Sequence, residues 1–240
     1  MLKAILFDFN GVIINDEPLH EKLIEQILIE ENLRLKPEEF RQVCLGRSDR
    51  VCLEELLNRR GRIVNEGYLE ELAARKSRYY QQQLAALEKL PIYPGLDDLI
   101  FKLRAAQIKL AIVSGALRSE IDLVLERTNL SQHFPIIVSG DDRVNSKPEP
   151  DGYLLAVERL NQHDSEMNLK PTDCLAIEDT FAGIQAAKQA GMQVVGVANS
   201  YPFHMMQRHA DWAVDYLFDL ELDRVQQLYA STSNASDKAT

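Results

Sequence analysis

The sequence predicts an α/β protein, a doubly wound parallel sheet with helices on both faces and an inserted α-helical cap domain. Short, nearly continuous apolar runs, typical of strands buried in parallel sheets, alternate with amphipathic helical patterns over most of the chain. One long interval after the first run has helical periodicity only. Alternation of strand and helix indicates a parallel sheet, and the strand-free interval indicates the insertion.

The first apolar run extends from Leu2 to Phe7 and meets an acid at Asp8. Four later runs are predicted as strands: Lys109–Val113, Pro135–Val138, Cys174–Ile177 and Gln193–Val197. The helices predicted around them are Leu96–Ala106, Ser119–Arg127, Tyr153–Leu160 and Gly183–Ala190. Such an order leaves the carboxyl ends of all strands on one edge, where ligands bind in open α/β sheets.

No strand is predicted between Asp16 and about Leu90. The amphipathic segments there are Glu21–Glu31, Pro37–Leu45, Val51–Arg60 and Tyr68–Leu90, followed by the stiff Pro91–Gly95 linker. We therefore expect a core domain at residues 1–15 and 92–225, and a helical cap at 16–91. Residues 226–240 are expected to hold a helix end and a tail, disordered from Ala230 onward because it is rich in Ser, Thr, Ala and Asp.

Composition limits the class of protein. The chain has 240 residues, 45% hydrophobic and 27% charged, which is typical of a soluble globular protein. Its net charge of −10 argues against a nucleic-acid partner, and the short basic run Arg59-Arg60-Gly61-Arg62 is typical of a solvated surface. The lack of a long apolar run or an N-terminal signal peptide leads us to expect no membrane partner and a cytoplasmic location. We expect the protein to be a monomer.

Three cysteines are present, Cys44, Cys52 and Cys174. Their number is odd and no Cys-x-x-Cys occurs, so we expect no disulfide framework and no zinc site, and three buried, inert thiols.

Polar residues follow four of the predicted strands. They are Asp8 after the first, Ser114 with its neighbouring backbone N–H groups after the second, Lys147 beyond the third, and the pair Glu178-Asp179 after the fourth. Carboxylate oxygens are the ligands that Mg²⁺ prefers, and a hydroxyl, backbone amides and an ammonium bind phosphate oxygens. A carboxylate held beside such a metal can attack phosphorus.

These segments resemble the haloacid dehalogenase-like hydrolase superfamily, in the subgroup of β-phosphoglucomutase and phosphoglycolate phosphatase. The four matching motifs, which occur in the family's order, are Phe7-Asp8-Phe9-Asn10-Gly11-Val12 with its continuation to His20, Ile112-Val113-Ser114-Gly115, Ser146-Lys147-Pro148-Glu149-Pro150-Asp151, and Ile177-Glu178-Asp179-Thr180-Phe181-Ala182-Gly183. The resemblance covers about residues 2–220.

The resemblance implies a role for each matching residue. Asp8 is expected to be the nucleophile and a Mg²⁺ ligand, and Asn10 to offer its backbone carbonyl to the metal. Glu178 and Asp179 are expected to hold the metal or its waters. The residues expected to hold the phosphoryl group are Ser114, Gly115 and Lys147. In the cap, Arg47 and Ser48 lie in the loop that would face the substrate, and His20 lies near the junction of core and cap.

Asn10 departs from the family pattern, which has an Asp that protonates the leaving oxygen at this position. An amide cannot exchange protons near neutral pH, and loss of a positioned acid or base costs ~10²–10⁴-fold in rate. The amide could belong to a branch with weak or different activity, or be an introduced substitution, or be compensated by another proton donor such as His20. Asn15 also stands where the family commonly has Asp.

We therefore expect a Mg²⁺-dependent phosphatase, or alternatively a phosphomutase, for a small phosphorylated metabolite. A weakly active homologue that binds a phosphorylated ligand is a second hypothesis, favoured by Asn10 alone. A phosphonoacetaldehyde hydrolase-like reaction would need a cap lysine, for which Lys22, Lys36, Lys76 and Lys89 are available. Signatures of P-loop, dinucleotide-binding, serine-hydrolase and zinc-protease sites are not found in the sequence.

Overall fold

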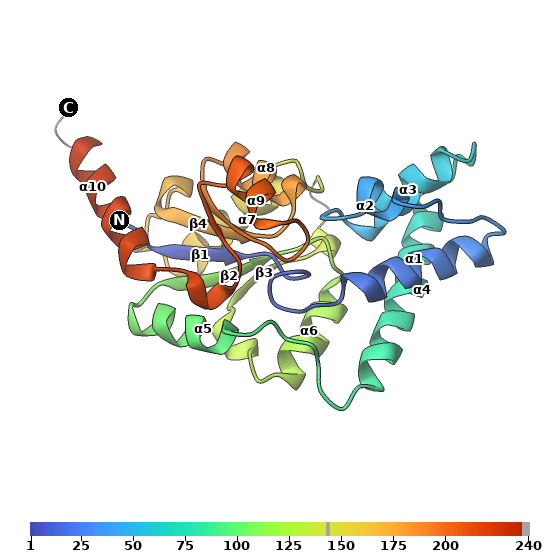
Figure 1. The fold of residues 1–240 in the computed structure, drawn as a ribbon, viewed down its shortest axis with the longest axis horizontal. Coiled ribbons are helices and arrows are strands. Elements are labelled where there is room, and N and C mark those ends of the chain that lie inside the picture. Colours follow the sequence, from blue (N-terminus) through green and yellow to red (C-terminus); the bar gives the residue numbers. More distant parts are fainter. Residues whose placement is uncertain (143–144, 237–240) are drawn as a thin grey trace.

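The computed structural model describes residues 1–142 and 145–236 and confirms the predicted α/β fold. Six strands form one parallel sheet in the order β3-β2-β1-β4-β5-β6 (Figure 1). The strands are β1 (Ala4–Phe7), β2 (Lys109–Val113), β3 (Ile136–Val138), β4 (Cys174–Glu178), β5 (Gln193–Val197) and β6 (Trp212–Val214). The sequence predicts the first five; β6, at the edge of the sheet, is an addition.

Helices cover both faces of the sheet, as the alternating strand side chains require. One face is packed by α5 (Leu96–Ala105), α6 (Arg118–Arg127) and α10 (Leu222–Ser236). The opposite face is packed by α7 (Asp151–His163), α8 (Phe181–Gln189) and α9 (Phe203–His209). Short 3₁₀ turns complete the core at η1 (Ser131–His133), η2 (Gly140–Asp142), η3 (Pro171–Asp173) and η4 (Leu217–Asp219).

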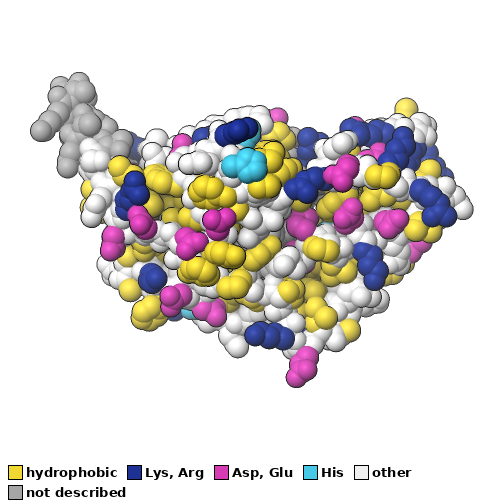
Figure 2. All heavy atoms as spheres, in the orientation of Figure 1, with side chains coloured by type: hydrophobic (Ala, Val, Ile, Leu, Met, Phe, Trp, Pro, Cys, Tyr) yellow, Lys and Arg dark blue, Asp and Glu magenta, His cyan; other side chains and the backbone are white. Residues whose placement is uncertain are grey.

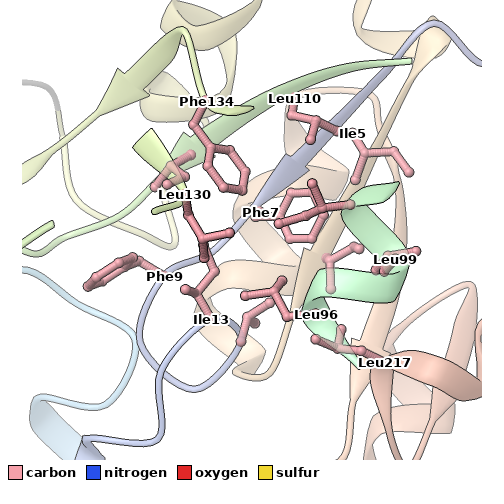
Figure 3. Packing of buried hydrophobic residues seen from close by; sticks show 14 of the residues in the cluster. Ile5, Phe7, Phe9, Ile13, Leu96, Leu99, Leu110, Leu130, Phe134 and Leu217 are labelled. Carbon is pink, nitrogen blue, oxygen red and sulfur yellow. The ribbon is translucent and has the colours of Figure 1, made fainter. Parts of the chain in front are cut away.

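The central strand β1 shows how the sheet divides the core. Ile5 and Phe7 point into the cluster beneath α5 and α6, whereas Ala4 and Leu6 point to the α7–α8 face. The ring of Phe7 meets Phe134 edge to face, with 5.6 Å between ring centroids (Figure 3). Because all four β1 side chains are buried, the strand is fixed in register and delivers the residue after Phe7 to the carboxyl edge.

The inserted helical cap consists of α1 (Glu17–Glu30), α2 (Glu39–Val43), α3 (Asp49–Asn58) and α4 (Glu66–Ala85). Their apolar stripes meet in a separate cluster, which includes Ile27, Leu53 and Leu72. The cap lies beyond the carboxyl edge of the sheet (Figure 1). Helix α4 ends at Ala85, five residues earlier than the periodicity predicts.

Two further expectations are wrong. The segment from Ala230, predicted to be disordered, continues as helix α10 as far as Ser236, because Val225 and Tyr229 anchor this helix on the core. Residues 237–240 lie outside the described residues. Cys44 and Cys52, expected to be free thiols, form a disulfide, because the turn between α2 and α3 brings their Cα atoms to 4.7 Å. Cys174 is a buried free thiol as expected, and burial raises its pKa to about 12.

The surface mixes apolar, acidic and basic side chains, with Lys and Arg gathered over the end that carries α2 and α3 (Figure 2). The basic run predicted there is largely neutralised: Arg59, Arg60 and Arg62 pair with Glu55, Glu39 and Glu31. Among the described residues no helix combines the length and apolar character needed to cross a bilayer.

Candidate active site

The carboxyl edge of the sheet brings together an aspartate, a lysine and a glutamate from three segments. Lys147 Nζ lies 2.9 Å from Asp8 Oδ1 and 2.6 Å from Glu178 Oε1. Asp8 Oδ1 also accepts the backbone N–H of Phe9 at 2.7 Å, which leaves Oδ2 as the oxygen that these groups do not engage. Burial acts to lower the pKa of Lys147, but the Asp8 and Glu178 carboxylates outweigh it and hold the pKa above its usual value. Lys147 is therefore a fixed positive charge.

Three acids converge beside this lysine. Asp8, Glu178 and Asp179 are all buried, and one oxygen from each lies within 4.8 Å of the others. Burial and the charge of Asp8 raise the pKa of Glu178 to about 7 and that of Asp179 well above its usual value. Asp179 Oδ1 has no hydrogen-bond partner among the described residues although it is buried. An unpartnered oxygen among three carboxylates fits a hard divalent cation such as Mg²⁺.

Gly11 makes room for this acid cluster. Its φ of +76° is in the left-handed region, and a Cβ on this residue would lie 1.9 Å from Asp179 Oδ2. The turn after β1 can therefore approach Asp179 only as glycine.

A small cavity of about 40 Å³ opens beside Asp8 and Lys147. Ser114 and Gly115 line it from the core, and Arg47 lines it from the cap. Ser114, Gly115 and Lys147 also line a larger neighbouring cavity of about 410 Å³, bordered by cap residues of α3 and α4. Every residue predicted to bind the phosphoryl group therefore faces space next to the candidate nucleophile.

The cap loop of residues 46–48 lies directly against the core. The Ser48 N–H donates to Ser146 Oγ at 2.9 Å, and a Cβ on Gly115 would come within 2.8 Å of the Ser48 nitrogen. Ser48 borders the larger cavity. The guanidinium of Arg47 is exposed at the cavity wall, and no ion-pair partner for it is found within residues 1–142 and 145–236.

Asn10 belongs to a polar network that reaches into the cap. Its Nδ2 donates to Asp16 Oδ2 at 2.9 Å and lies 2.9 Å from His20 Nε2. The Tyr80 hydroxyl donates to the same Asp16 oxygen. On the other side of the imidazole, Lys76 Nζ lies 2.6 Å from His20 Nδ1. His20 lies at the junction of core and cap, as the sequence predicts, because it contacts Asn10 of the core and Lys76 of the cap.

Lys76 determines which nitrogen carries the proton when the His20 ring is neutral. An ammonium can only donate, so Nδ1 accepts, and the neutral ring carries its proton on Nε2. That proton can be donated to Asp16 Oδ2, 3.2 Å away. Burial acts to lower the pKa of Lys76, but Asp49 and Glu120 outweigh it and raise the pKa above its usual value. A charged, fully buried Lys76 does not suit the nucleophilic amine that a phosphonoacetaldehyde hydrolase-like reaction needs.

Two residues on the small cavity can exchange protons near neutral pH. His20 is one: burial and the Lys76 charge act to lower its pKa, and Asp16 and Glu120 together outweigh them and raise it. Glu17, the first residue of α1, is the other, because burial raises its pKa to about 7. Sequence reasoning missed Glu17 and Asp16, although both lie inside the first matching motif. It also missed Tyr80, whose only signal was its place in a helical pattern.

Comparison with known proteins identifies the family. The model of the haloacid dehalogenase-like hydrolases matches residues 2–191. The chain is 32% identical to the β-phosphoglucomutase of Bacillus subtilis over 236 residues, covering 94% of this chain and 95% of the relative. It is 28% identical to a phosphorylated carbohydrates phosphatase of Thermotoga maritima, with coverages of 83% and 87%.

A solved β-phosphoglucomutase from Clostridium difficile has the same architecture. It superimposes with a TM-score of 0.82 at 25% identity, covering 97% of this chain and 99% of that one. The matched motifs, the six-stranded sheet and the cap all indicate the same family. This chain belongs to the haloacid dehalogenase-like hydrolase family.

Proposed function

We propose that this protein is a Mg²⁺-dependent phosphatase of a small phosphorylated metabolite, and that it works through an aspartyl-phosphate intermediate on Asp8. The observation that carries the proposal is the contact of Asp8 with Lys147 beside two further buried acids, at the wall of a cavity. The names of the relatives, a phosphoglucomutase and a carbohydrate phosphatase, favour a sugar phosphate as the substrate class.

The residues divide the first chemical step among themselves. Lys147 and Ser114 bind the phosphoryl oxygens, and Asp8 Oδ2 attacks phosphorus from the opposite side to the leaving oxygen. A bond from Oδ2 to phosphorus forms, and the bond from phosphorus to the leaving oxygen breaks. Mg²⁺, held by Asp8, Asp179, Glu178 and the backbone carbonyl of Asn10, would offset the negative charge of the phosphate and the acids when bound. Water then cleaves the aspartyl phosphate and releases inorganic phosphate.

Proton transfer is the weak part of this cycle. A sugar alkoxide is a poor leaving group and needs a proton, which Asn10 cannot supply. His20 and Glu17 are the proton-exchanging groups on the cavity wall that could take this part. We therefore propose slow turnover of sugar phosphates and faster turnover of aryl phosphates, whose leaving group needs no proton.

The same site would also suit two alternative functions, a phosphomutase and a ligand-binding protein without turnover. A phosphomutase would use the same intermediate and pass the phosphoryl group to a sugar hydroxyl, with Arg47 gripping a second anionic group of the substrate. A ligand-binding homologue without turnover is favoured by Asn10, whose amide is fixed by Asp16 in a donor role.

Phosphate release should be measured from a panel of sugar phosphates and from an aryl phosphate, with Mg²⁺ or with EDTA. The shape-conserving Asp8→Asn variant is the control. We expect Mg²⁺-dependent release that Asp8→Asn abolishes, together with phosphate label that stays on acid-quenched protein only when Asp8 is present. Release that survives Asp8→Asn, or that EDTA does not change, would overturn the proposal. Tight sugar-phosphate binding by calorimetry with no release would favour the ligand-binding alternative.

A further inference from the structure

Two hydroxyl groups contact the acid pair Glu178-Asp179 at the carboxyl end of β4, one for each acid. Tyr153, fully buried on α7, donates from Oη to Glu178 Oε1 at 2.5 Å. Ser200, in the segment after β5, donates from Oγ to Asp179 Oδ2 at 2.5 Å. Neither residue belongs to the strand-end motifs from which the candidate site was predicted.

Each hydroxyl donates to one oxygen of its carboxylate and not to the other. Glu178 Oε1 accepts from Tyr153 and from Lys147 Nζ at 2.6 Å, whereas among residues 1–142 and 145–236 Oε2 has only a long contact with Thr180 Oγ1 at 3.4 Å. Asp179 Oδ2 is filled by Ser200, whereas Oδ1 is buried and has no hydrogen-bond partner in the described part of the chain. Both acids therefore present one unsaturated oxygen.

The two hydroxyls determine which oxygen of each acid stays available. The terminal torsion of a carboxylate is broad and roughly two-fold, so an unrestrained acid can interchange its two oxygens or settle between them. A donor on one oxygen fixes the torsion. Carboxylates that bind metals are commonly oriented by such outer hydrogen bonds, and the loss of one typically costs 10–100-fold in metal affinity or activity.

Ser200 is itself held in place from two sides. Its neighbour Asn199 donates to the Gly11 carbonyl at 2.6 Å, on the turn that follows β1. The ring of Tyr201 stacks on Phe181 of α8, with 3.9 Å between centroids. The segment after β5 is thus tied to the turn beyond Asp8 and to the helix beyond Asp179, so the Ser200 hydroxyl is anchored relative to both acids.

We propose that Tyr153 and Ser200 are positioning residues of the metal site: their hydroxyls hold Glu178 and Asp179 so that Glu178 Oε2 and Asp179 Oδ1 are offered to the cation. This inference rests on the proposed Mg²⁺ dependence, and it assigns to the chain an outer layer of the site that the four motifs do not contain.

Calorimetric titration of Mg²⁺ alone into the metal-free full chain tests it. Tyr153→Phe and Ser200→Ala each remove one oxygen atom. We expect each to weaken Mg²⁺ binding by about 10–100-fold. Ser200→Thr, which keeps a hydroxyl, should restore binding to within about threefold of the parent. Melting of the metal-free protein is recorded for every variant, because a purely structural role would lower the melting temperature without this selective loss of metal affinity.

Two matched controls separate positioning from the general loss of a buried hydroxyl. Tyr229→Phe removes a hydroxyl that donates to the Cys174 carbonyl at 2.6 Å, at the opposite end of β4. Ser139→Ala removes a buried hydroxyl that donates to Asp142 Oδ2 at 3.2 Å, beyond β3. Both should bind Mg²⁺ within about twofold of the parent.

The outcomes distinguish the inference from the function on which it rests. A parent chain that binds Mg²⁺, with Tyr153→Phe and Ser200→Ala binding equally well, overturns the positioning role alone. Equal weakening in the controls overturns it too. A parent chain that does not bind Mg²⁺ overturns the proposed function, and the positioning role with it. If Tyr153→Phe fails to fold, the Ser200→Ala and Ser200→Thr pair decides the question, because Ser200 is only partly buried.

Discussion

Introducing an acid at residue 10 should change both stability and turnover, and the distance from Asn10 to Asp16 sets the size of the effect on stability. Asn10 Nδ2 lies 2.9 Å from Asp16 Oδ2, so Asn10→Asp places two carboxylate oxygens at this separation. Two unit charges 2.9 Å apart repel by about 6 kcal/mol at an effective dielectric constant of ~20. Carboxylates this close do not both ionise, and one keeps a proton.

Nearby positive charge reduces the repulsion, since the Lys76 ammonium contacts His20 of the same network. We therefore expect one carboxyl of the new pair to keep its proton at a pH where an isolated carboxyl is ionised. A raised carboxyl pKa means that the folded variant holds a proton that the unfolded chain has released. The variant should therefore match the parent in acid, where folded and unfolded chains both hold the proton, and become less stable than the parent as pH rises above the ordinary carboxyl range, by about 3 kcal/mol because nearby positive charge offsets roughly half of the repulsion.

The retained proton is what a sugar alkoxide needs from a general acid. We expect Asn10→Asp to accelerate phosphate release from a sugar phosphate by ~10²-fold or more, and release from an aryl phosphate much less. Urea unfolding of the metal-free protein at pH 4.5 and 7.5, together with both release assays, measures the two effects. Asn15→Asp adds the same charge at an exposed position of the same loop and serves as the control.

Equal pH dependence of unfolding in Asn10→Asp, Asn15→Asp and the parent would refute the carboxylate contact. Unchanged release rates with both substrates would refute the idea that Asn10 limits proton transfer.

Three other outcomes are expected. Because the pKa of Glu178 is raised to about 7, its proton competes with the cation. Mg²⁺ affinity measured by calorimetry should therefore increase from pH 6 to pH 8, and Glu178→Gln should remove most of that increase. An affinity of the parent that does not change with pH would contradict this. Gly11→Ala should lower the free energy of unfolding in urea by about 1–3 kcal/mol and weaken Mg²⁺ binding, because the new Cβ would overlap Asp179. If the variant keeps the stability and the Mg²⁺ affinity of the parent, the turn after β1 can move to accommodate the methyl group. Reduction of the Cys44–Cys52 disulfide by dithiothreitol should lower the free energy of unfolding by about 2–3 kcal/mol, as expected for a short closed loop. The stability of Cys44→Ser should not change with the reductant. If dithiothreitol destabilises both proteins equally, the loss does not come from this disulfide.

The strand-end residues could be predicted because topology fixes them. A parallel sheet aligns the carboxyl ends of its strands, so Asp8, Ser114 and Glu178 had to meet once their apolar runs were recognised. The edge strand β6 gives a weaker signal, because it has three residues and only Val214 is buried. Tail residues beyond Ala230 have the composition of a disordered segment, and tertiary packing of the preceding turns makes them helical.

The remainder of the candidate site depends on contacts between distant segments. Tyr80 meets Asp16 across 64 residues, and Lys76 meets His20 across 56, so no local pattern marks either pair. Ser200 is one of many serines in loops until the fold places it beside Asp179. The disulfide likewise depends on the path of the turn between two helices, which spacing alone does not determine.

Gly115 has a consequence for how dry the reaction space can be. A Cβ at Gly115 would lie 2.8 Å from the Ser48 nitrogen and 2.9 Å from its Cα, so a methyl group there would push the cap loop away from the turn after β2. Solvent could then enter beside Asp8, where, on the proposed mechanism, water would compete with other acceptors for the phosphoryl group. On the proposed mechanism, the lack of a side chain at residue 115 therefore helps to keep water away from Asp8, and so bears on whether water or a sugar hydroxyl accepts the phosphoryl group.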